Sequence, residues 1–232
     1  MIQLDLLDAS PRVLIACECS GTVRDAFLAR GFDAWSCDLK PDEKRSNRHI
    51  TGDARDIISW GWDMLIVAHP PCTRLCNSGV RWLSAPPPGR TLPDMWAELD
   101  EAAELFATFL HAPIDRIAIE NPIMHRHGKK RIRGYVEPAQ SVQPWQFGHR
   151  AFKRTCFWLK NLDPLMETRR LDPPAPGTAA HKRWSGIHRH TGWGKGGEAR
   201  AANRSRFWPG MAAAMADQWG AQAMAEIFGK AA

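Results

Sequence analysis

Residues 65–72, Leu65-Ile66-Val67-Ala68-His69-Pro70-Pro71-Cys72, predict a buried strand and the point at which it ends. The apolar run is too short for a helix, and such a run is typical of a strand in a covered sheet. The two prolines cannot continue the hydrogen-bonded ladder, so the chain must turn there. Cys72 is therefore expected at the carboxyl end of a strand, where open α/β sheets bind ligands. A thiol at that place suits a nucleophile, although a single free cysteine is more often a small buried hydrophobic residue.

The composition is that of a globular chain with a polyanionic partner. Of 232 residues, 44% are apolar and 24% charged, which allows one large domain, or one domain with a small appendage, around a substantial core. The formal net charge is +6 and the pI is about 9.2, values that favour a polyanionic partner. Eleven tryptophans accompany a single tyrosine, and their indole rings can either stack on bases or fill the core.

The apolar stretches and the cysteines indicate the cellular compartment in which the protein is expected. No stretch is long and apolar enough to span a bilayer, and the first residues lack the basic start of a signal peptide, so we expect a cytoplasmic protein. The cysteines lack the dense spacing of a secreted scaffold, so we expect free thiols. They are Cys17, Cys19, Cys37, Cys72, Cys76 and Cys156. No cysteine or histidine pair with ligand-like spacing is backed by a second pair, so no metal site is predicted.

A strand, a turn and a helix open the chain. Residues 12–17 predict a short buried strand, 18–21 (Glu-Cys-Ser-Gly) a turn, and 22–30 a helix ended by Gly31. Such a turn before a helix N-terminus can cradle a polar or anionic group of a cofactor. Taken alone the signal is weak, because many α/β loops contain Ser-Gly.

Two aspartates follow at places that suit a nucleoside. Residues 33–37 predict a second strand that ends at Asp38, about twenty residues after the turn, where an acidic side chain can bind ribose hydroxyls. A helix cap or turn is an equally good interpretation of Asp38. Asp53 is expected to meet the far end of the nucleoside, and Asp56 to cap the next short helix.

A carboxylate is expected beside Cys72. The long segment 73–91 is predicted to be a functional loop such as a lid, and 93–111 an amphipathic crossover helix with proline in its first turn. Residues 116–120 then form a strand that ends at Glu120, just before another proline. A thiol and a carboxylate at adjacent strand ends can face one substrate.

The second half of the chain carries most of the basic side chains. Residues 125–133 are predicted to be a solvated loop that contacts phosphates, and 147–162 a further pair of strands. Residues 163–206 are rich in proline, glycine, basic and aromatic residues, which fits a nucleic-acid surface or, alternatively, a solvated disordered loop. A final helix is predicted over 209–228. The candidate DNA-binding residues are Arg74, Arg81, Arg126, Lys129, Lys130, Arg131, Lys182, Arg183 and Arg189.

An ordered series of motifs resembles the DNA cytosine-5 methyltransferases, in particular their short phage and prophage members. The series spans nearly the whole chain in the order of that family. It consists of Ala16-Cys17-Glu18-Cys19-Ser20-Gly21, Asp38, Asp53, Pro70-Pro71-Cys72, Glu120-Asn121, Phe147-Gly148 followed by Lys153-Arg154-Thr155, and Pro209-Gly210-Met211.

The resemblance implies an α/β, Rossmann-like S-adenosylmethionine-dependent methyltransferase fold with a reduced basic target-recognition segment. It implies three parts: 1–162 for catalysis and cofactor binding, 163–206 for DNA recognition, and 207–232 as a helix returning to the first part. The implied catalytic residues are Cys72, Glu120, Lys153 and Arg154. The implied cofactor-binding residues are Cys17, Glu18, Cys19, Ser20, Gly21, Asp38, Asp53, Pro70, Gly210 and Met211.

The activity implied by the resemblance is methyl transfer from S-adenosylmethionine to C5 of a flipped cytosine in double-stranded DNA. Cys72 adds to C6 of the ring, which makes C5 nucleophilic, while Glu120 holds or protonates the ring nitrogen. An amino-methyltransferase shares the fold but carries an aromatic residue at the position of Cys72. Three alternatives stay open: an altered donor such as a carboxylated S-adenosylmethionine, a free nucleotide as substrate, and a non-catalytic DNA-binding relative.

Several positions depart from the family pattern. Cys19 replaces the first glycine of the cofactor turn, Pro122 follows Glu-Asn where valine is usual, and Met211 replaces an asparagine near the cofactor's amino-acid tail. Ala151 and Thr155 stand at two of the three base-orienting positions, with Lys153 at the other. The target-recognition segment is short, which predicts low sequence specificity.

Overall fold

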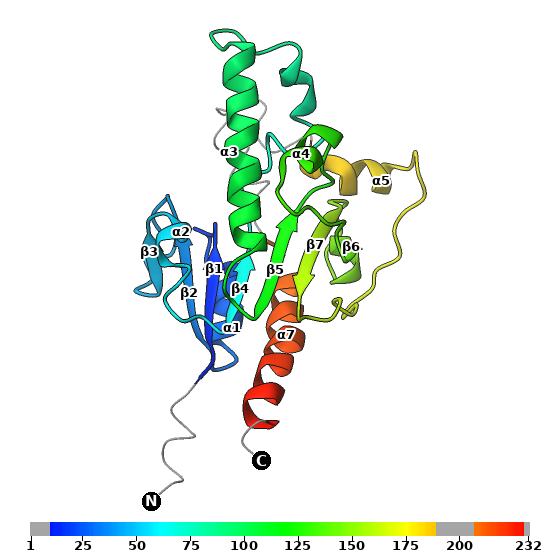
Figure 1. The fold of residues 1–232 in the computed structure, drawn as a ribbon. Coiled ribbons are helices and arrows are strands. Elements are labelled where there is room, and N and C mark those ends of the chain that lie inside the picture. Colours follow the sequence, from blue (N-terminus) through cyan, green and yellow to red (C-terminus); the bar gives the residue numbers. More distant parts are fainter. Residues whose placement is uncertain (1–9, 189–206, 230–232) are drawn as a thin grey trace, which may run out of the picture.

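The computed structural model describes residues 10–188 and 207–229. The described residues form one seven-stranded sheet with the order β3-β2-β1-β4-β5-β7-β6 (Figure 1). The strands are β1 (Arg12–Ala16), β2 (Asp33–Asp38), β3 (His49–Thr51), β4 (Met64–Val67), β5 (Arg116–Asn121), β6 (Gln140–Val142) and β7 (Thr155–Lys160). Strand β7 alone runs in the direction opposite to the other strands of this sheet. This arrangement is typical of the Rossmann-like fold of S-adenosylmethionine-dependent methyltransferases and confirms the predicted fold class.

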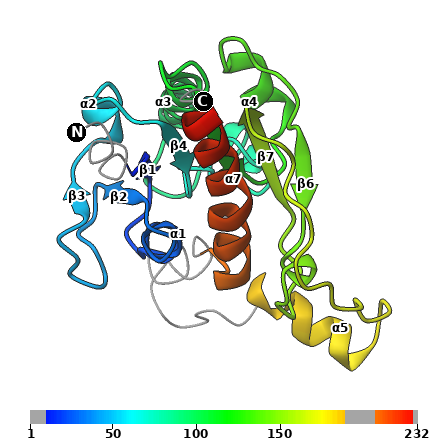
Figure 2. The same ribbon diagram turned by 90° about the horizontal axis from the view of Figure 1, so that it is seen from below.

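Helices cover both faces of the sheet (Figure 2). Helix α3 lies on one face, and α1 and α7 pack together on the other. The helical elements are α1 (Thr22–Leu28), α2 (Ala54–Ile57), α3 (Leu92–Leu110), α4 (Arg126–Arg131), α5 (Ala179–Trp184), α7 (Pro209–Gly229) and the 3-10 turns η1 (Val80–Leu83), η2 (Pro144–Gln146) and η3 (Ser185–His188). Among the described helices, none is long and apolar enough to cross a membrane.

The central strands form where the apolar runs predict them. All four residues of β4 are buried, as are all six of β5, because each strand has helices on both faces. Each fully buried leucine or isoleucine contributes about 1.5–3 kcal/mol relative to an exposed one. Helix α3 begins at a reciprocal cap: Thr91 accepts a hydrogen bond from the Asp94 amide, and the Asp94 carboxylate accepts one from the Thr91 amide. Its buried stripe, which includes Leu99 and Phe106, packs on the sheet.

Two predictions about the second half of the chain are wrong. Residues 126–131 form helix α4, not a solvated loop, because His125 caps its first turn by accepting a hydrogen bond from the Gly128 amide at 3.0 Å. The segment 147–162 contains one strand, β7, rather than a pair. Its second partner is β6, which lies upstream in the chain. Turn-forming sequence, with Gly148 at a φ of 86°, fills the interval before β7.

Other differences concern loops and caps. Asp53, not Asp56, caps helix α2 by accepting a hydrogen bond from the Arg55 amide at 2.9 Å. The segment 73–91 is partly folded, with η1 near its middle. The segment 163–206 is described only to residue 188, where it includes α5, so Arg189 lies outside the described residues. The three-part division of the chain stays a prediction.

Candidate active site

The site is built at the carboxyl ends of β4 and β5. These strands are parallel neighbours, with Val67 paired with Ile119, so the residues that follow them emerge at the same edge of the sheet, as predicted. After β4 the two prolines turn the chain, and the Cys72 carbonyl then accepts hydrogen bonds from the amides of Leu75 and Cys76 at 3.0 and 2.9 Å. A tight turn therefore holds the half-buried Cys72 beside the end of β5.

Glu120 contributes a buried carboxyl group to this edge. It lies on β5 opposite Phe157 and is only 4% exposed. Burial raises the pKa of Glu120 to about 7, although the positive charge of Lys153 opposes the shift. The carboxyl group is therefore partly protonated at neutral pH, which suits a group that must give a proton to a bound ring.

Neighbouring groups shift the pKa of the Cys72 thiol. Its contact with the Cys76 thiol, its burial and the charge of Glu120 all raise the pKa of Cys72, while Lys153 lowers it. The pKa of Cys76 is shifted downward, because its sulfur accepts hydrogen bonds from Cys72 and from Ser78. These shifts show that Cys72, Cys76, Glu120 and Lys153 lie within electrostatic range of one another.

Of the two basic residues predicted to be catalytic, the structure brings one into this cluster. Lys153 lies just before β7, its amide donates a hydrogen bond to the Gln143 side chain at 3.0 Å, and its charge acts on both Cys72 and Glu120. Arg154 is exposed, and its charge acts instead on Cys156.

Two more residues of the site, His69 and Asn121, stand in the sequence motifs that contain Cys72 and Glu120, but neither was predicted to have a role of its own. The Nε2 atom of His69 is buried without a hydrogen-bond partner among the described residues, and the ring lies 4.9 Å from that of Phe207, centre to centre. Burial, with the charge of Lys153, lowers the pKa of His69 well below its usual value. Asn121 is fully buried, and both polar atoms of its side chain likewise lack partners there. Each unpaired buried polar group costs about 1–3 kcal/mol, so such groups point to a ligand or water that pairs them. In the sequence, the feature that could have indicated roles for His69 and Asn121 was their position close to Cys72 and Glu120.

The predicted cofactor turn follows β1. Cys17 has a left-handed backbone with a φ of 57°, which is rare for a residue with a side chain. Glu18 is fully buried, and its carboxylate accepts hydrogen bonds from the amides of Val23 at 2.8 Å and Arg24 at 3.1 Å. The carboxylate of Glu18 thus completes the N-terminus of α1, which leaves the backbone of the turn as the part that can meet a cofactor.

Gly21 is required by the shape of this turn. Its φ is 64°, and a Cβ atom there would lie 2.2 Å from the buried guanidinium group of Arg24. Arg24 also pairs with Asp42 at 2.7 Å, and the Glu43 amide donates a hydrogen bond to the Cys19 carbonyl at 2.9 Å. The loop after β2 is thereby fixed against the turn. Ser20 is buried and bonds to its neighbours within the turn.

The two predicted nucleoside-binding acids lie near the end of β1. The charges of Asp38 and Asp53 both contribute to raising the pKa of Cys17, after burial as the main cause. Asp38 accepts a hydrogen bond from the Lys40 amide at 2.9 Å, and Asp53 is held by Arg55, whose hydrogen bond lowers the pKa of Asp53. The backbone turn and these carboxylates together fit a cofactor with a nucleoside part, which S-adenosylmethionine has.

The residues predicted at the cofactor's amino-acid tail have packing roles. The Gly210 amide donates a hydrogen bond to Nε2 of His149 at 2.9 Å, and a Cβ atom on Gly210 would lie 2.2 Å from the Phe147 carbonyl oxygen. Glycine is therefore needed for α7 to begin so close to this turn. Met211 is buried in the core between α7 and the sheet, and Pro70 is also buried. Their contact with a cofactor stays a prediction.

The candidate DNA-binding residues fall into two groups. Those of the first group are held by acidic partners: Arg74 by Glu98 at 2.6 Å, Lys129 by Glu137 at 2.7 Å and Arg131 by Asp100 at 2.6 Å. Those of the second group have no salt bridge among the described residues. They are Arg81, Arg126, Lys130, Lys182 and Arg183. Only the second group offers charges that can bind phosphates without first giving up a partner.

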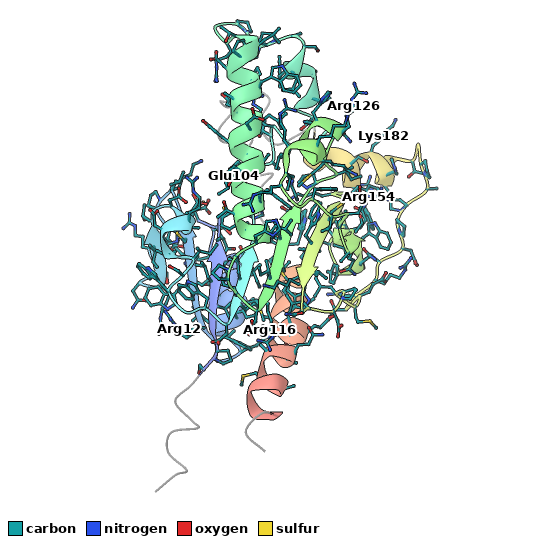
Figure 3. All side chains as sticks on the ribbon, viewed as in Figure 1. Arg12, Glu104, Arg116, Arg126, Arg154 and Lys182 are labelled. Atoms are coloured by element: carbon teal, nitrogen blue, oxygen red, sulfur yellow. The ribbon has the colours of Figure 1, made fainter. Side chains whose placement is uncertain are left out.

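These charges gather beyond the edge that carries Cys72 and Glu120. Figure 3 shows Arg126, Arg154 and Lys182 toward the carboxyl end of β5, with Arg12 and Arg116 at the opposite edge. Helices α4 and α5 lie there on opposite faces of the sheet (Figures 1 and 2). A cleft of about 550 Å³ beside α5 is lined by Arg150, Leu171, Asp172, Pro174, Ala180, Arg183 and Trp184.

Comparison with known proteins adds distant structural likenesses. No protein-family model matches the chain, and no curated protein matches it. A solved structure of the Entamoeba histolytica methyltransferase EhMeth superposes with a TM-score of 0.44 and 14% identity, covering 72% of this chain and 62% of that one. An E. coli protein described as a DNA modification methyltransferase encoded within a prophage superposes with a TM-score of 0.43 and 17% identity, covering 71% and 52%. The chain thus spans less than two thirds of the length of either protein. Its own strand order and site define a chain with a methyltransferase-like α/β fold.

Proposed function

We propose that this protein is an S-adenosylmethionine-dependent DNA cytosine-5 methyltransferase. The observation that carries the proposal is the pairing of Cys72 and Glu120 at neighbouring strand ends, with Lys153 within electrostatic range of both. An amino-methyltransferase needs no thiol at this place, and a DNA-binding protein without activity needs neither the thiol nor a buried carboxyl group whose pKa is near neutrality.

Each residue of the site has a separate role in activating C5 of cytosine, which is a weakly nucleophilic carbon. The Cys72 thiolate adds to C6 of the flipped cytosine, which makes C5 electron-rich. Glu120, partly protonated at neutral pH, donates a proton to the ring nitrogen and so favours the addition. Lys153 stabilises both the thiolate and the carboxylate that forms. Bound S-adenosylmethionine supplies the methyl group that C5 accepts, after which the C5 proton is lost and Cys72 is eliminated.

The turn after β1 and the acids beside it are proposed to hold the cofactor. We propose that the Asp38 carboxylate accepts hydrogen bonds from ribose hydroxyls, and that the backbone of 17–21 meets the polar groups of the amino-acid part. Asp53 already has Arg55 as a partner, so its proposed contact with the nucleoside uses the lone pairs that remain.

Double-stranded DNA is the proposed substrate. The charges without salt-bridge partners on α4 and α5 flank the carboxyl edge, and they would bind phosphates on both sides of the flipped base. Trp184, in the cleft beside α5, would offer a stacking face there. Because contacts with phosphates carry no sequence information directly, we expect low sequence specificity.

One experiment separates the candidate activities. The protein is incubated with S-adenosylmethionine labelled in the methyl group and with duplex DNA, and the nucleosides are then analysed by mass. Labelled 5-methylcytosine supports the proposal, and Cys72→Ala provides the control for background activity. A product carrying a larger C5 group with a carboxylated donor would indicate an altered donor, and modification of deoxycytidine monophosphate alone would indicate a free nucleotide substrate. DNA binding without any product would contradict the proposal.

A further inference from the structure

The side chain of His69 lies at the edge of the sheet and has no role in the methyl transfer proposed above. His69 stands two residues after the end of β4 and three before Cys72. The Ala68 amide donates a hydrogen bond to the Ala16 carbonyl at 2.9 Å, so the pairing of β4 with β1 fixes the backbone as far as residue 68. The Nε2 atom of the ring is nevertheless buried without a hydrogen-bond partner in the described part of the chain. Such an atom indicates a polar group that pairs it when the site is occupied.

The ring of His69 lies toward the same face of the sheet as the carboxyl group of Glu120. Glu120 pairs with Phe157 across the antiparallel strands β5 and β7, so their two side chains emerge on one face. The Phe157 ring stacks on the Phe207 ring at 6.5 Å between centres, and the Phe207 ring lies 4.9 Å from that of His69. A substrate that meets Glu120 on this face is therefore expected to meet His69 as well.

The surroundings of His69 keep its imidazole neutral. Burial and the positive charge of Lys153, just before β7, both lower the pKa of His69. A neutral imidazole has one N–H group, which donates, and one nitrogen, which accepts. The ring is therefore suited to a hydrogen bond with an uncharged group, such as a carbonyl oxygen of a base.

Cytosine has one polar group on its Watson–Crick edge for which the proposed site has no partner so far. Protonated Glu120 can donate to N3 and accept from the exocyclic amine, which leaves the acceptor O2 without a donor. The neighbours of Lys153 do not supply one. Ala151 has no polar side chain, and the buried Thr155 hydroxyl donates to the Lys153 carbonyl at 3.2 Å.

We propose that His69 donates a hydrogen bond from Nε2 to O2 of the flipped cytosine; this role rests on the function proposed above. The contact fixes the ring at O2 while Glu120 fixes it at N3 and the amine, so that C6 is held facing Cys72. His69 and Glu120 together present two donors and one acceptor, in the order that O2, N3 and the amine of cytosine require. Thymine also has O2, so His69 orients the base and Glu120 distinguishes cytosine from thymine.

Three substitutions of His69 test this contact by position. Glutamine places an amide nitrogen near the position of Nε2, asparagine places one near Nδ1, and phenylalanine keeps a ring against Phe207 without a donor. With duplex DNA, kcat/KM should fall by about tenfold or more in His69→Phe and His69→Asn, and by much less in His69→Gln. The affinity for S-adenosylmethionine should stay the same in all three. Equal losses in the three variants, or no loss in any, would overturn the contact.

His111→Phe is the matched control for these variants. His111 lies between α3 and β5, at the opposite edge of the sheet, where its Nε2 atom donates a hydrogen bond to the Arg133 carbonyl at 2.9 Å. Its replacement should leave kcat/KM unchanged. A loss equal to that in His69→Phe would show that the assay responds to any change of a histidine, and it would overturn the assignment.

A base analogue tests which atom His69 binds. In 2-thiocytosine a sulfur atom, a weak acceptor, replaces O2. The replacement should lower kcat/KM in the unaltered protein by a factor at least about three times larger than in His69→Phe, which has already lost the contact. Equal factors in the two proteins would overturn the proposal. So would a sulfur effect that disappears in Lys153→Met and persists in His69→Phe, because O2 would then be bound by Lys153.

Thermal unfolding without DNA or cofactor gives a measurement that does not depend on activity. His69→Phe removes an unpaired polar atom and keeps a ring, so Tm should rise by about 2–4 °C. A fall in Tm, with activity lost in proportion to the folded fraction, would make His69 structural and overturn the contact. Absence of methylated product from the unaltered protein would overturn the proposed function and this contact with it. Product from the unaltered protein, with full activity in His69→Phe, would overturn the contact alone.

Discussion

In the chain the loop 73–91 and helix α3 lie between Cys72 and Glu120, yet the two residues follow β-sheet positions that pair directly, Val67 with Ile119. The thiol and the carboxyl group therefore respond to each other: the charge of Glu120 raises the pKa of Cys72. This relationship makes the chemistry of each group depend on the protonation of the other, and five predictions follow from the site around it.

Replacing Cys72 with serine should abolish turnover while leaving folding and cofactor binding nearly intact. A hydroxyl is a far weaker nucleophile than a thiolate at neutral pH, so a loss of at least about a thousandfold in kcat is expected. Nucleoside analysis measures turnover, and circular dichroism with isothermal titration measures folding and binding. If Cys72 were only a buried hydrophobic residue, the variant would lose stability and keep activity in proportion to its folded fraction.

Replacing Glu120 with glutamine should stabilise the fold at alkaline pH. The folded pKa of Glu120, about 7, is raised above its usual value of 4.5, so its contribution to stability is fully present below about pH 4.5 and is lost as the pH rises through 7. At pH 8 the variant should be more stable by up to roughly 3 kcal/mol, with little difference near pH 4.5. Urea unfolding at the two values of pH measures this. Equal stabilities at pH 8 would show that burial does not disfavour the carboxylate.

The same substitution should remove most of the activity. In the unaltered protein, kcat/KM should fall as the pH rises above 7, since the step requires protonated Glu120, and this alkaline limb should be absent from whatever activity Glu120→Gln retains. Glu104→Gln, an exposed site on α3, provides a control that should keep the original profile. A profile in the unaltered protein that is flat from pH 6 to 9 would contradict the proton-donating role.

Replacing Asp38 with alanine should weaken S-adenosylmethionine binding by about tenfold or more and leave DNA binding unchanged. Its carboxylate ends β2 near the cofactor turn and is proposed to bind ribose hydroxyls, with hydrogen bonds to a charged group worth about 1.5–3 kcal/mol. Titration calorimetry measures the first affinity and fluorescence anisotropy the second. Asp56→Ala, exposed on α2, is the matched control. Equal losses of both affinities in Asp38→Ala would assign it a structural role.

DNA affinity should fall steeply with salt, and the second group of basic residues should carry that dependence. Replacing Arg126 or Lys130 with glutamine should reduce the slope of log affinity against log salt by about one each, because each releases roughly one counterion. Lys129→Gln and Arg131→Gln, the matched controls, should change it less, since both side chains already have acidic partners. Anisotropy with a labelled duplex between low and moderate salt measures the slopes, and a nearly salt-independent affinity would exclude phosphate contacts by these helices.

The sheet and the edge that carries Cys72 and Glu120 were predictable because short apolar runs and strand-ending prolines act locally. The run before Cys72 predicts β4, and the strand ending at Glu120 predicts β5. Their adjacency followed from the general rule that crossover connections place parallel strands side by side. The strand β6 escaped prediction because only three residues form it and its pairing comes from β7, the next strand along the chain.

The roles of individual polar residues were harder to predict, since they depend on burial and on partners that the sequence does not show. Glu18 and Gly210 match cofactor motifs, yet the first completes a helix N-terminus and the second allows close packing. Helix α4 was missed because its dense positive charge suggested solvation, whereas Asp100 and Glu137 neutralise part of that charge. For His69 and Asn121, only the folded chain shows that their buried polar atoms lack partners.

The reversed direction of β7 decides where this chain can be lengthened. Because β7 runs antiparallel to β5, it begins at the edge that carries Cys72 and Glu120 and ends at the far edge. There, Lys160 and Asn161 donate hydrogen bonds to the carbonyls of Ile114 and Asp115, both at 2.8 Å. The following segment then returns along the outside of the molecule to α5 (Figure 1). Extra residues inserted just after Asn161 would enter on the side of the sheet remote from Cys72, so the chain has a natural point for acquiring larger recognition elements without disturbing its chemistry.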